Sequence, residues 1–220
     1  MMKIKRSLLM MVAGAVVVLS CNKDEQVVAP TIANEALTTV QLQLVNTANA
    51  SDKPTAQWEQ LLDNSGNPLP VDVSEADLTL KPNTTYTAKI VLLDKTQSPV
   101  FVVSDEIKER GNYHMFFYQP LPTSQPLVIP NNYPANQDDI YPDPIPTPVP
   151  AGSPLNLTVT ITDRDTNTQQ YPIGLETKFV TGAAGSGWIR IVLRHQPNTK
   201  NGTYEPGSTD LDVGFNVTIQ

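Results

Sequence analysis

Apolar and polar side chains alternate at every second position in several stretches of this 220-residue chain. The clearest are residues 40–45, 155–161, 188–195 and 211–219. A period of two places successive side chains on opposite faces of a β-strand, so one face can be buried. Shorter stretches with a strand-like residue pattern predict further strands at residues 56–61, 88–93, 100–103, 113–118 and 175–181. The pattern predicts an all-β fold.

The segment Leu80-Lys81-Pro82-Asn83-Thr84-Thr85-Tyr86 indicates which all-β architecture to expect. It resembles the L-x-P-x-T-x-Y segment of fibronectin type III and related immunoglobulin-like sandwiches. In those domains the tyrosine begins a strand, and its hydroxyl bonds back to the preceding corner. The resemblance implies an immunoglobulin-like β-sandwich, and it carries no information about ligand.

Residues 119–154 interrupt this pattern, because they contain eleven of the chain's 20 prolines. Proline cannot donate to a sheet ladder and favours extended polyproline II structure. The segment is either a long loop on a single sandwich or a stiff linker between two small β-sandwich domains. We favour one domain over residues 37–220 with a long Pro-rich insertion, because only about four strands follow it.

The first 20 residues have the pattern of a secretory signal: Lys3, Lys5 and Arg6 precede an apolar run from 7 to 19. Val18-Leu19-Ser20-Cys21 then resembles the lipobox of bacterial lipoproteins. That resemblance implies removal of residues 1–20, lipidation of Cys21, and a tether over residues 21–36. Three acyl chains would exceed the two-signal threshold for stable membrane anchoring. The alternative is an ordinary secretory signal with a cysteine near the cleavage site.

Asn22-Lys23-Asp24-Glu25 follows the cysteine and resembles the acidic tag of many Bacteroidota lipoproteins. There the tag accompanies export to the cell surface, which implies an outer-membrane, lipid-anchored and surface-exposed protein. The formal charge is −7 for the chain and −10 once three signal-peptide cations are removed. Such acidity argues against nucleic acid as a partner. Since Cys21 is the one cysteine, the fold is expected to be stable without disulfides.

Two short motifs have ordinary structural explanations. Asp163-x-Asp165-x-Asn167 resembles the start of a calcium loop, but Thr168 and Gly174 stand where an EF-hand needs glycine and glutamate. We interpret it as a turn. The GAAGSG loop at 182–187 precedes a strand and has no lysine, so we expect a hairpin connection in place of a phosphate site.

His114 and His195 are the only histidines, and both fall in predicted strands. Imidazole is a good ligand for zinc or copper, so the pair is a candidate divalent-metal site. Two histidines need a carboxylate for a closed site, and nothing in the spacing selects one. The candidates are Asp94, Asp105, Glu106 and Asp210. The alternative is that each histidine is a hydrogen-bonded structural residue.

The sequence contains no catalytic arrangement that we can identify. It lacks a G-x-S-x-G nucleophile elbow, and the Asp138-Asp139 pair lies in the proline-rich segment. We therefore expect a protein that is not an enzyme and has no resident cofactor, apart from the candidate divalent metal.

Residues 37–220 as a whole resemble a family of Bacteroidota lipoproteins found alongside TonB-dependent receptors. The resemblance rests on LTLKPNTTYTAKIVLLD, YHMFFY, IGLETKFVTGAAGSGWIRIVLRHQPNTK and the terminal TDLDVGFNVTIQ. It implies an accessory binding role in nutrient or metal capture, with a TonB-dependent receptor as partner and acyl chains as the membrane contact. A divalent-metal binding lipoprotein and a structural or adhesive surface protein are the alternatives.

Overall fold

The computed structural model describes residues 37–121, 155–204 and 206–220. The predicted signal peptide (1–20), the tether (21–36) with Cys21, and residues 122–154 of the proline-rich segment lie outside the described residues.

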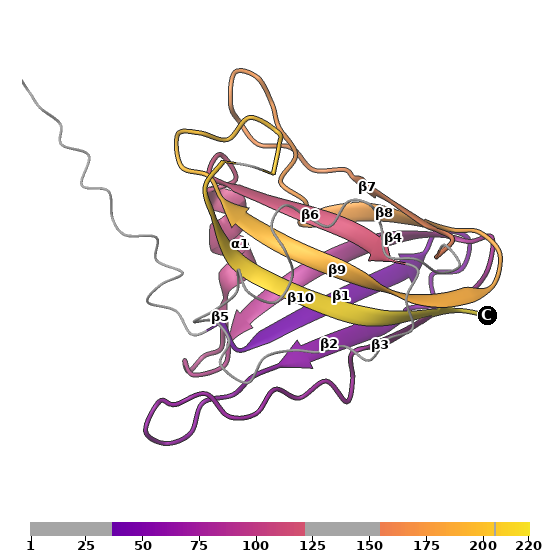
Figure 1. Cartoon of the computed structure of the whole chain (residues 1–220), viewed down its shortest axis with the longest axis horizontal. Helices are drawn as coiled ribbons and strands as arrows, with labels where there is room; N and C mark the ends of the chain where they lie inside the picture. The colour runs from indigo at the N-terminus through magenta and orange to yellow at the C-terminus, as the bar shows by residue number, and fades with distance from the viewer. Residues whose placement is uncertain (1–36, 122–154, 205) are drawn as a thin grey trace, which may run out of the picture. The chain divides into compact units, whose positions relative to one another are not determined.

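The described residues form ten strands and one short helix (Figure 1). In chain order they are β1 (Thr39–Asn46), β2 (Thr55–Glu59), β3 (Asp77–Leu80), β4 (Thr85–Asp94), β5 (Phe101–Val102), α1 (Val103–Glu109), β6 (His114–Leu121), β7 (Leu157–Ile161), β8 (Glu176–Thr181), β9 (Gly185–His195) and β10 (Ser208–Ile219).

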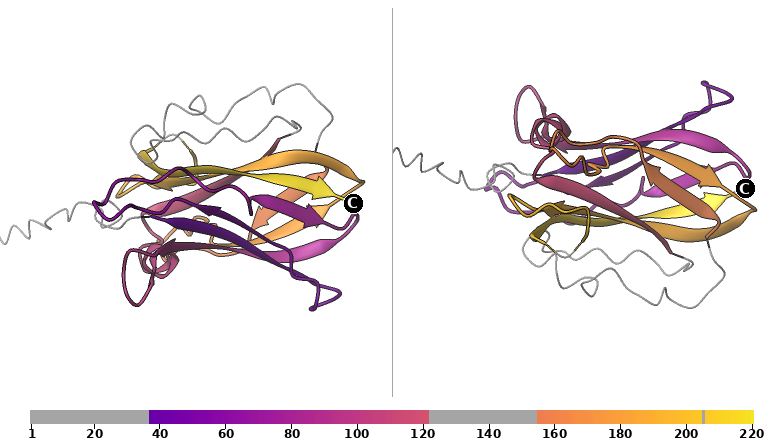
Figure 2. Two further views of the ribbon diagram at one scale, coloured as in Figure 1. Left: turned by 90° about the horizontal axis from the view of Figure 1, so that it is seen from below. Right: turned by 90° about the horizontal axis from the view of Figure 1, so that it is seen from above.

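These strands build two sheets that lie one above the other (Figure 2). The six-stranded sheet has the order β2-β1-β4-β8-β7, with β5 paired to β4. The four-stranded sheet has the order β3-β10-β9-β6. Neighbouring strands are antiparallel except β3 and β10, which run parallel. The predicted all-β sandwich is confirmed.

Strands from both sides of the proline-rich segment share both sheets. In the six-stranded sheet β4 pairs with β8, and in the four-stranded sheet β6 pairs with β9. Because each sheet needs both halves of the chain, the described strands form one sandwich, and the alternative of two small sandwiches is wrong. The segment's expected start also changes: residues 119–121 belong to β6, where Pro120 is tolerated because β6 is an edge strand.

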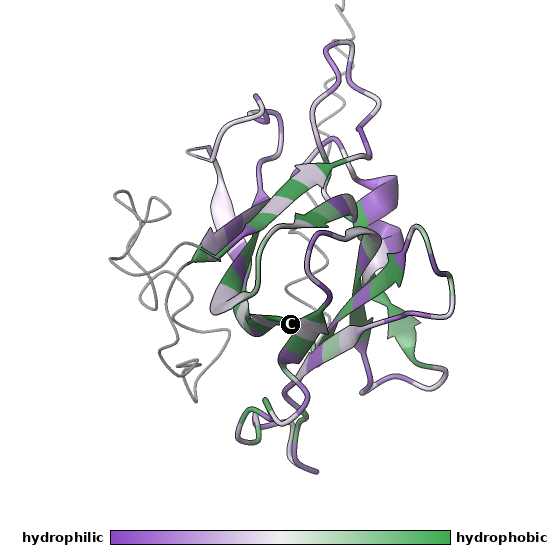
Figure 3. Ribbon diagram, turned by 90° about the vertical axis from the view of Figure 1, so that its right-hand side faces the viewer, coloured by the Kyte–Doolittle hydropathy of each residue, from purple (hydrophilic) through white to green (hydrophobic). Residues whose placement is uncertain are grey.

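One hydrophobic core lies between the sheets. Apolar and polar bands alternate along the strands (Figure 3). The apolar residues of the core lie on the inward faces of the two sheets. Trp58, Tyr86, Phe179 and Phe215 are fully buried in it. Burial of such side chains is the main stabilising term in a domain that forms no disulfide.

Tyr86 forms the predicted corner. The backbone N–H of Lys81 donates to the Tyr86 hydroxyl at 2.9 Å, so the ring is buried while its polar end is satisfied. The contact fixes how the chain passes from β3 in one sheet to β4 in the other.

One local element was not specified by the sequence pattern, and one expectation changes. The charged residues 104–110 belong largely to α1, which is amphipathic, since Val103 and Ile107 lie one turn apart and enter the core. The GAAGSG segment is not a hairpin, because β8 and β9 lie in different sheets. Its small residues carry the chain across the sandwich, and β9 already begins at Gly185.

Candidate functional site

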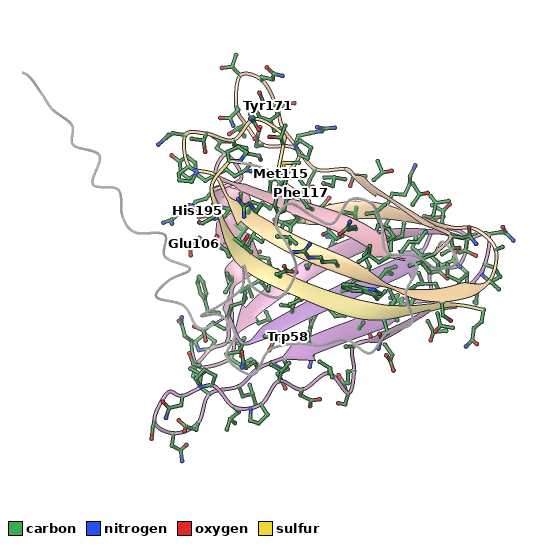
Figure 4. All side chains as sticks on the ribbon, viewed as in Figure 1. Trp58, Glu106, Met115, Phe117, Tyr171 and His195 are labelled. Carbon is green, nitrogen blue, oxygen red and sulfur yellow. The ribbon has the colours of Figure 1, made fainter. Side chains whose placement is uncertain are left out.

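The two histidines meet at one end of the four-stranded sheet. His114 is the first residue of β6, His195 is the last of β9, and the two are partners in the strand register. Their ring centroids are 5.0 Å apart with planes inclined by 26°, which is a stacked pair. Figure 4 shows His195 at this end, where Glu106 of α1 also lies.

The hydrogen bond of His114 fixes its neutral tautomer. Its Nδ1 lies 3.0 Å from the carbonyl oxygen of Arg110, just after α1. A carbonyl can only accept, so Nδ1 carries the proton and Nε2 bears the lone pair. Nε2 is buried and has no hydrogen-bond partner among the described residues. It is a potential ligand or proton acceptor.

Asp210 faces that nitrogen. Its Oδ2 lies 3.9 Å from Nε2 of His114. The register between β10 and β9 shifts between Thr209 and Leu211, so Asp210 is the extra residue of a β-bulge. A bulge re-aims a side chain that strict alternation would place elsewhere. We refer to His114, His195 and Asp210 as the histidine cluster.

Burial shifts the titration of all three groups. Desolvation lowers the pKa of His114 to about 4, and the neighbouring His195 and cations contribute in the same direction. Desolvation also lowers the pKa of His195, with Arg110 adding to the effect. Asp210 moves the other way: burial raises its pKa to about 7, against the opposing charge of Arg194. Between pH 4 and 7 His114 and Asp210 are therefore both mainly neutral and do not form an ion pair.

Buried polar contacts hold the chain around the histidine cluster. Lys200 Nζ donates to the Gly111 carbonyl at 2.7 Å and lies 2.9 Å from the Asp165 carboxylate. Gln196, which follows His195, donates from Nε2 to the carbonyls of Thr203 and Pro206. A Cβ at Gly207, whose φ is +87°, would collide with the His195 carbonyl, so glycine is required there.

The cluster is close to metal-binding geometry without reaching it. Two bonds of about 2 Å at a tetrahedral angle would place ligand atoms about 3.3 Å apart, and the His114–Asp210 separation is 3.9 Å. In the part of the chain that the structure describes, no group of three or more His, Cys, Asp or Glu side chains is arranged to hold a metal ion. A cation would require Asp210 to approach His114.

The other carboxylates considered as ligands have different roles. Asp94 accepts from the N–H of Thr96 at 2.9 Å, and Glu106 pairs with Arg110 at 3.0 Å. Asp105 lies in the first turn of α1. Of the four candidate carboxylates, Asp210 is the one for which the described contacts include a histidine.

The Asp163–Asn167 segment is a turn region in which the carboxylates bind the chain itself. Asp163 accepts from the N–H groups of Gly174 and Leu175, at 2.8 and 3.0 Å. Asp165 accepts from the N–H of Tyr171 at 2.9 Å and pairs with Lys200. These oxygens organise the connection between β7 and β8, which agrees with the turn interpretation.

A second feature, which the sequence did not reveal, is a polar groove on the outer face of the six-stranded sheet. It has a volume of about 420 Å³. Gln41 Nε2 donates to Gln57 Oε1 at 2.7 Å, and Gln43 Nε2 donates to Gln41 Oε1 at 3.0 Å. We call it the glutamine groove; its polar lining is Gln41, Gln43, Thr55, Gln57, Ser74, Glu75 and Asp77. Alternation predicted the outward glutamines, but the approach of residues 74–77 depends on long-range folding.

Comparison of the chain with protein-family models, with curated proteins and with solved structures yields no match. Of the described residues, α1 is the one helix, and no helix has the length and apolar character needed to cross a membrane. Cys21 and the Asp138-Asp139 pair lie outside the described residues.

Proposed function

We propose that the protein is a lipid-anchored lipoprotein of the outer membrane, exposed on the cell surface, that binds and presents a ligand without catalysing a reaction. In this proposal it is an accessory protein for capture of a nutrient or a metal by a TonB-dependent receptor. The membrane contact is the acylated Cys21.

The observation that carries the proposal is the position of the chain's single cysteine. Cys21 follows Val18-Leu19-Ser20 directly after an apolar run, where a lipobox requires it. The described domain begins at Leu37, 16 residues further on. Sixteen residues can extend to about 50 Å, so the sandwich would stand clear of the membrane surface.

The glutamine groove supports the capture part of the proposal. Its amide side chains offer donors and acceptors on an open surface, next to the carboxylates of Glu75 and Asp77. Such a lining suits a neutral, hydroxyl-rich ligand such as a saccharide, or a cationic one. Orientation by a few convergent polar groups is typical of ligand sites.

Lipidation is tested with the full chain expressed in a Bacteroidota host. Mass spectrometry of the amino-terminal peptide is expected to show cleavage before Cys21 and an acylated cysteine. The C21A variant is expected to lose membrane association, whereas S20A, which keeps a small residue before the cysteine, retains it. An unmodified thiol, or equal membrane association of C21A, would contradict the proposal.

The partner and the surface location are tested on the same cells. Protease added to intact cells should remove the wild-type domain, and affinity purification from solubilised outer membranes should recover a TonB-dependent receptor. A Q41A/Q57A variant should still be anchored and degraded by surface protease, but should lose retention on immobilised glycans. Full protection of the domain in intact cells would exclude surface exposure.

A second candidate function, divalent-metal binding, is favoured by the meeting of His114, His195 and Asp210. We expect binding of Zn²⁺ or Cu²⁺ to draw Asp210 toward His114 and to weaken as the imidazoles protonate. Calorimetry with each metal compares wild type with H195Q and D210N, which keep similar volume. Isotherms that are the same for all three proteins would eliminate the histidine cluster as the metal site.

A further inference from the structure

A cleft of about 520 Å³ lies between α1 and the turn that leads into β5. Figure 1 shows these two elements at the same end of the sandwich. One wall of the cleft is residues 97–102, and the other is the charged side of α1 together with the residue after it, from Asp105 to Arg110. The cleft shares no lining residue with the glutamine groove and contains no member of the histidine cluster. It is therefore a separate surface of the domain.

The wall formed by the turn and β5 is apolar at its centre. Val100 is 47% exposed, which is the largest exposed fraction of any large hydrophobic side chain among the described residues. Pro99 beside it is exposed, and Phe101 and Val102 are half-buried. Isolated exposed valines are common on protein surfaces, but a run of apolar residues along a cleft is typical of a place where another molecule packs.

The wall formed by α1 carries negative charge that the described residues do not neutralise. Glu106 pairs with Arg110, one turn further along, at 3.0 Å. Asp105 and Glu109 are exposed, and within residues 37–121, 155–204 and 206–220 neither carboxylate takes part in an ion pair or a hydrogen bond. Three carboxylates and one guanidinium line the cleft, which leaves an excess of two negative charges.

The positions of these two carboxylates oppose the stability of the helix. Asp105 and Glu109 are four residues apart, so their like charges lie on the same side of α1 and repel each other. Glu109 is also the last residue of α1, where a carboxylate opposes the helix dipole. The nearby cation Lys108 lies outside the cleft, 3.9 Å from Glu176 of β8. Residues that break local rules of stability are expected at functional sites, so a ligand explains the two carboxylates better than the fold does.

The chemistry of the two walls selects the occupant. The excess negative charge favours a cation, and the exposed valine favours an apolar group. In the part of the chain that the structure describes, no group of three or more His, Cys, Asp or Glu side chains is arranged to hold a metal ion. The side chains of lysine and arginine combine a cationic head with an apolar stem. A protein segment that brings such a side chain together with an apolar neighbour matches both walls.

We propose that the cleft between α1 and β5 is a docking site for a basic, partly apolar segment of a partner protein. A lysine or arginine head contacts Asp105 and Glu109, and an apolar side chain of the same segment covers Val100. In an extended segment these two side chains are two residues apart, because alternate positions point to the same side. This surface is additional to the glutamine groove, and the proposal depends neither on lipidation nor on the ligand of that groove.

The test measures binding of a synthetic peptide to the immobilised full chain. The probe is a peptide of four Lys-Val-Lys repeats, passed over the protein in a non-ionic detergent, and a peptide of four Glu-Val-Glu repeats is the control. We expect the basic peptide to bind with an affinity that falls as salt is added, and the acidic peptide not to bind. Absence of binding by the basic peptide would overturn the proposal.

Three variants locate the contacts. D105N/E109Q should weaken binding of the basic peptide about tenfold, and V100S should weaken it severalfold, while the urea midpoint of each variant stays close to that of wild type because these side chains are exposed. D63N/E176Q removes the same two kinds of carboxylate outside the cleft and should leave binding unchanged. Wild-type affinity in D105N/E109Q would contradict the proposal. An equal loss in D63N/E176Q would also contradict it, because the peptide would then bind the acidic surface in general.

Discussion

The two outer faces of the sandwich differ sharply, although both belong to strands with an apolar side toward the same core. On the six-stranded sheet, the outward side chains of β4 and β8 include exposed polar residues such as Thr87, Lys89 and Lys178. On the four-stranded sheet, the outward residues of β9 from Trp188 to Arg194 are buried, and Arg190 pairs there with the buried Asp212 of β10. One face is a solvated surface with a polar groove, and the other has the properties of an interior.

A charged residue in a strand therefore does not by itself mark a solvent-facing position. Arg190 Nε lies 2.9 Å from Asp212 Oδ1, and the Arg190 Nη2 group contacts Oδ2, so the pair is bidentate. Lys89 and Glu176 on the opposite sheet are 3.9 Å apart and well exposed. The energetic consequences of losing a partner should differ accordingly.

The largest expected effect is therefore that of D212A. It would leave a buried guanidinium without its carboxylate, which typically costs about 3–5 kcal/mol of unfolding free energy. K89A on the opposite face should cost less than about 0.5 kcal/mol. Urea unfolding of both variants measures the contrast; equal losses would show that the two faces are energetically alike.

The next effect concerns Asp210 at the end of the four-stranded sheet and depends on pH. Its pKa is about 7 in the folded protein, against an ordinary value of 3.8 for an aspartate, so its ionisation costs stability progressively as pH rises from about 4 to 7. D210N cannot ionise and should be more stable than wild type by roughly 4 kcal/mol above pH 7. The difference should vanish near pH 4.

The contribution of His114 to stability changes with pH in the opposite direction, because its pKa is lowered from 6.5 to about 4. Its stabilising neutral form is fully present above pH 6.5, and stability is lost as pH falls toward 4. In wild type the slopes from His114 and Asp210 largely cancel between pH 4 and 6.5. Urea midpoints of D210N should therefore rise over that range, and a D210N profile parallel to wild type would contradict the assignment.

A smaller effect on stability is expected when the same substitution, valine to alanine, is made on each face. Val192 is fully buried and Val180 is 37% exposed. V192A is expected to cost about 1–2 kcal/mol through lost burial and cavity formation, and V180A less than about 0.5 kcal/mol. Thermal or urea unfolding compares them directly. A loss at position 192 no larger than at position 180 would remove the evidence for a packed outer face.

The smallest effect on stability is expected in the glutamine groove. Gln57 is half-buried, and its amide partner is Gln41 on the neighbouring strand. Q57A should change the unfolding free energy by less than about 0.5 kcal/mol, while ligand binding, if the groove is the capture surface, should fall. A large stability loss would mean that the glutamines are structural.

Much of the fold follows from local sequence pattern. Alternation located most of the strands, and the Leu80–Tyr86 segment predicted a corner that the Lys81–Tyr86 hydrogen bond confirms. The charged segment before β6 was left open between a loop and a helical turn, and the glycine-rich stretch after β8 was wrongly predicted to be a hairpin, because each fits several local structures. Only tertiary pairing decides among them.

The candidate site was less accessible to sequence reasoning. Both histidines were identified, but their meeting depends on the register of β6 and β9, which local pattern does not specify. Asp210 reaches His114 through a β-bulge, and a bulge has no signature in this stretch. Asp212 alternates with apolar residues like a solvent-facing position, so the burial of its face could not be read from the strand itself.

The contrast between the two faces is tested most directly by the accessibility of Trp188. In a W58F variant of the full chain Trp188 is the one remaining tryptophan, and its fluorescence reports the outer face of the four-stranded sheet alone. We predict a blue-shifted emission and weak quenching by acrylamide in native buffer, both lost in denaturant. Native emission and quenching equal to those of a free indole in water would contradict the account.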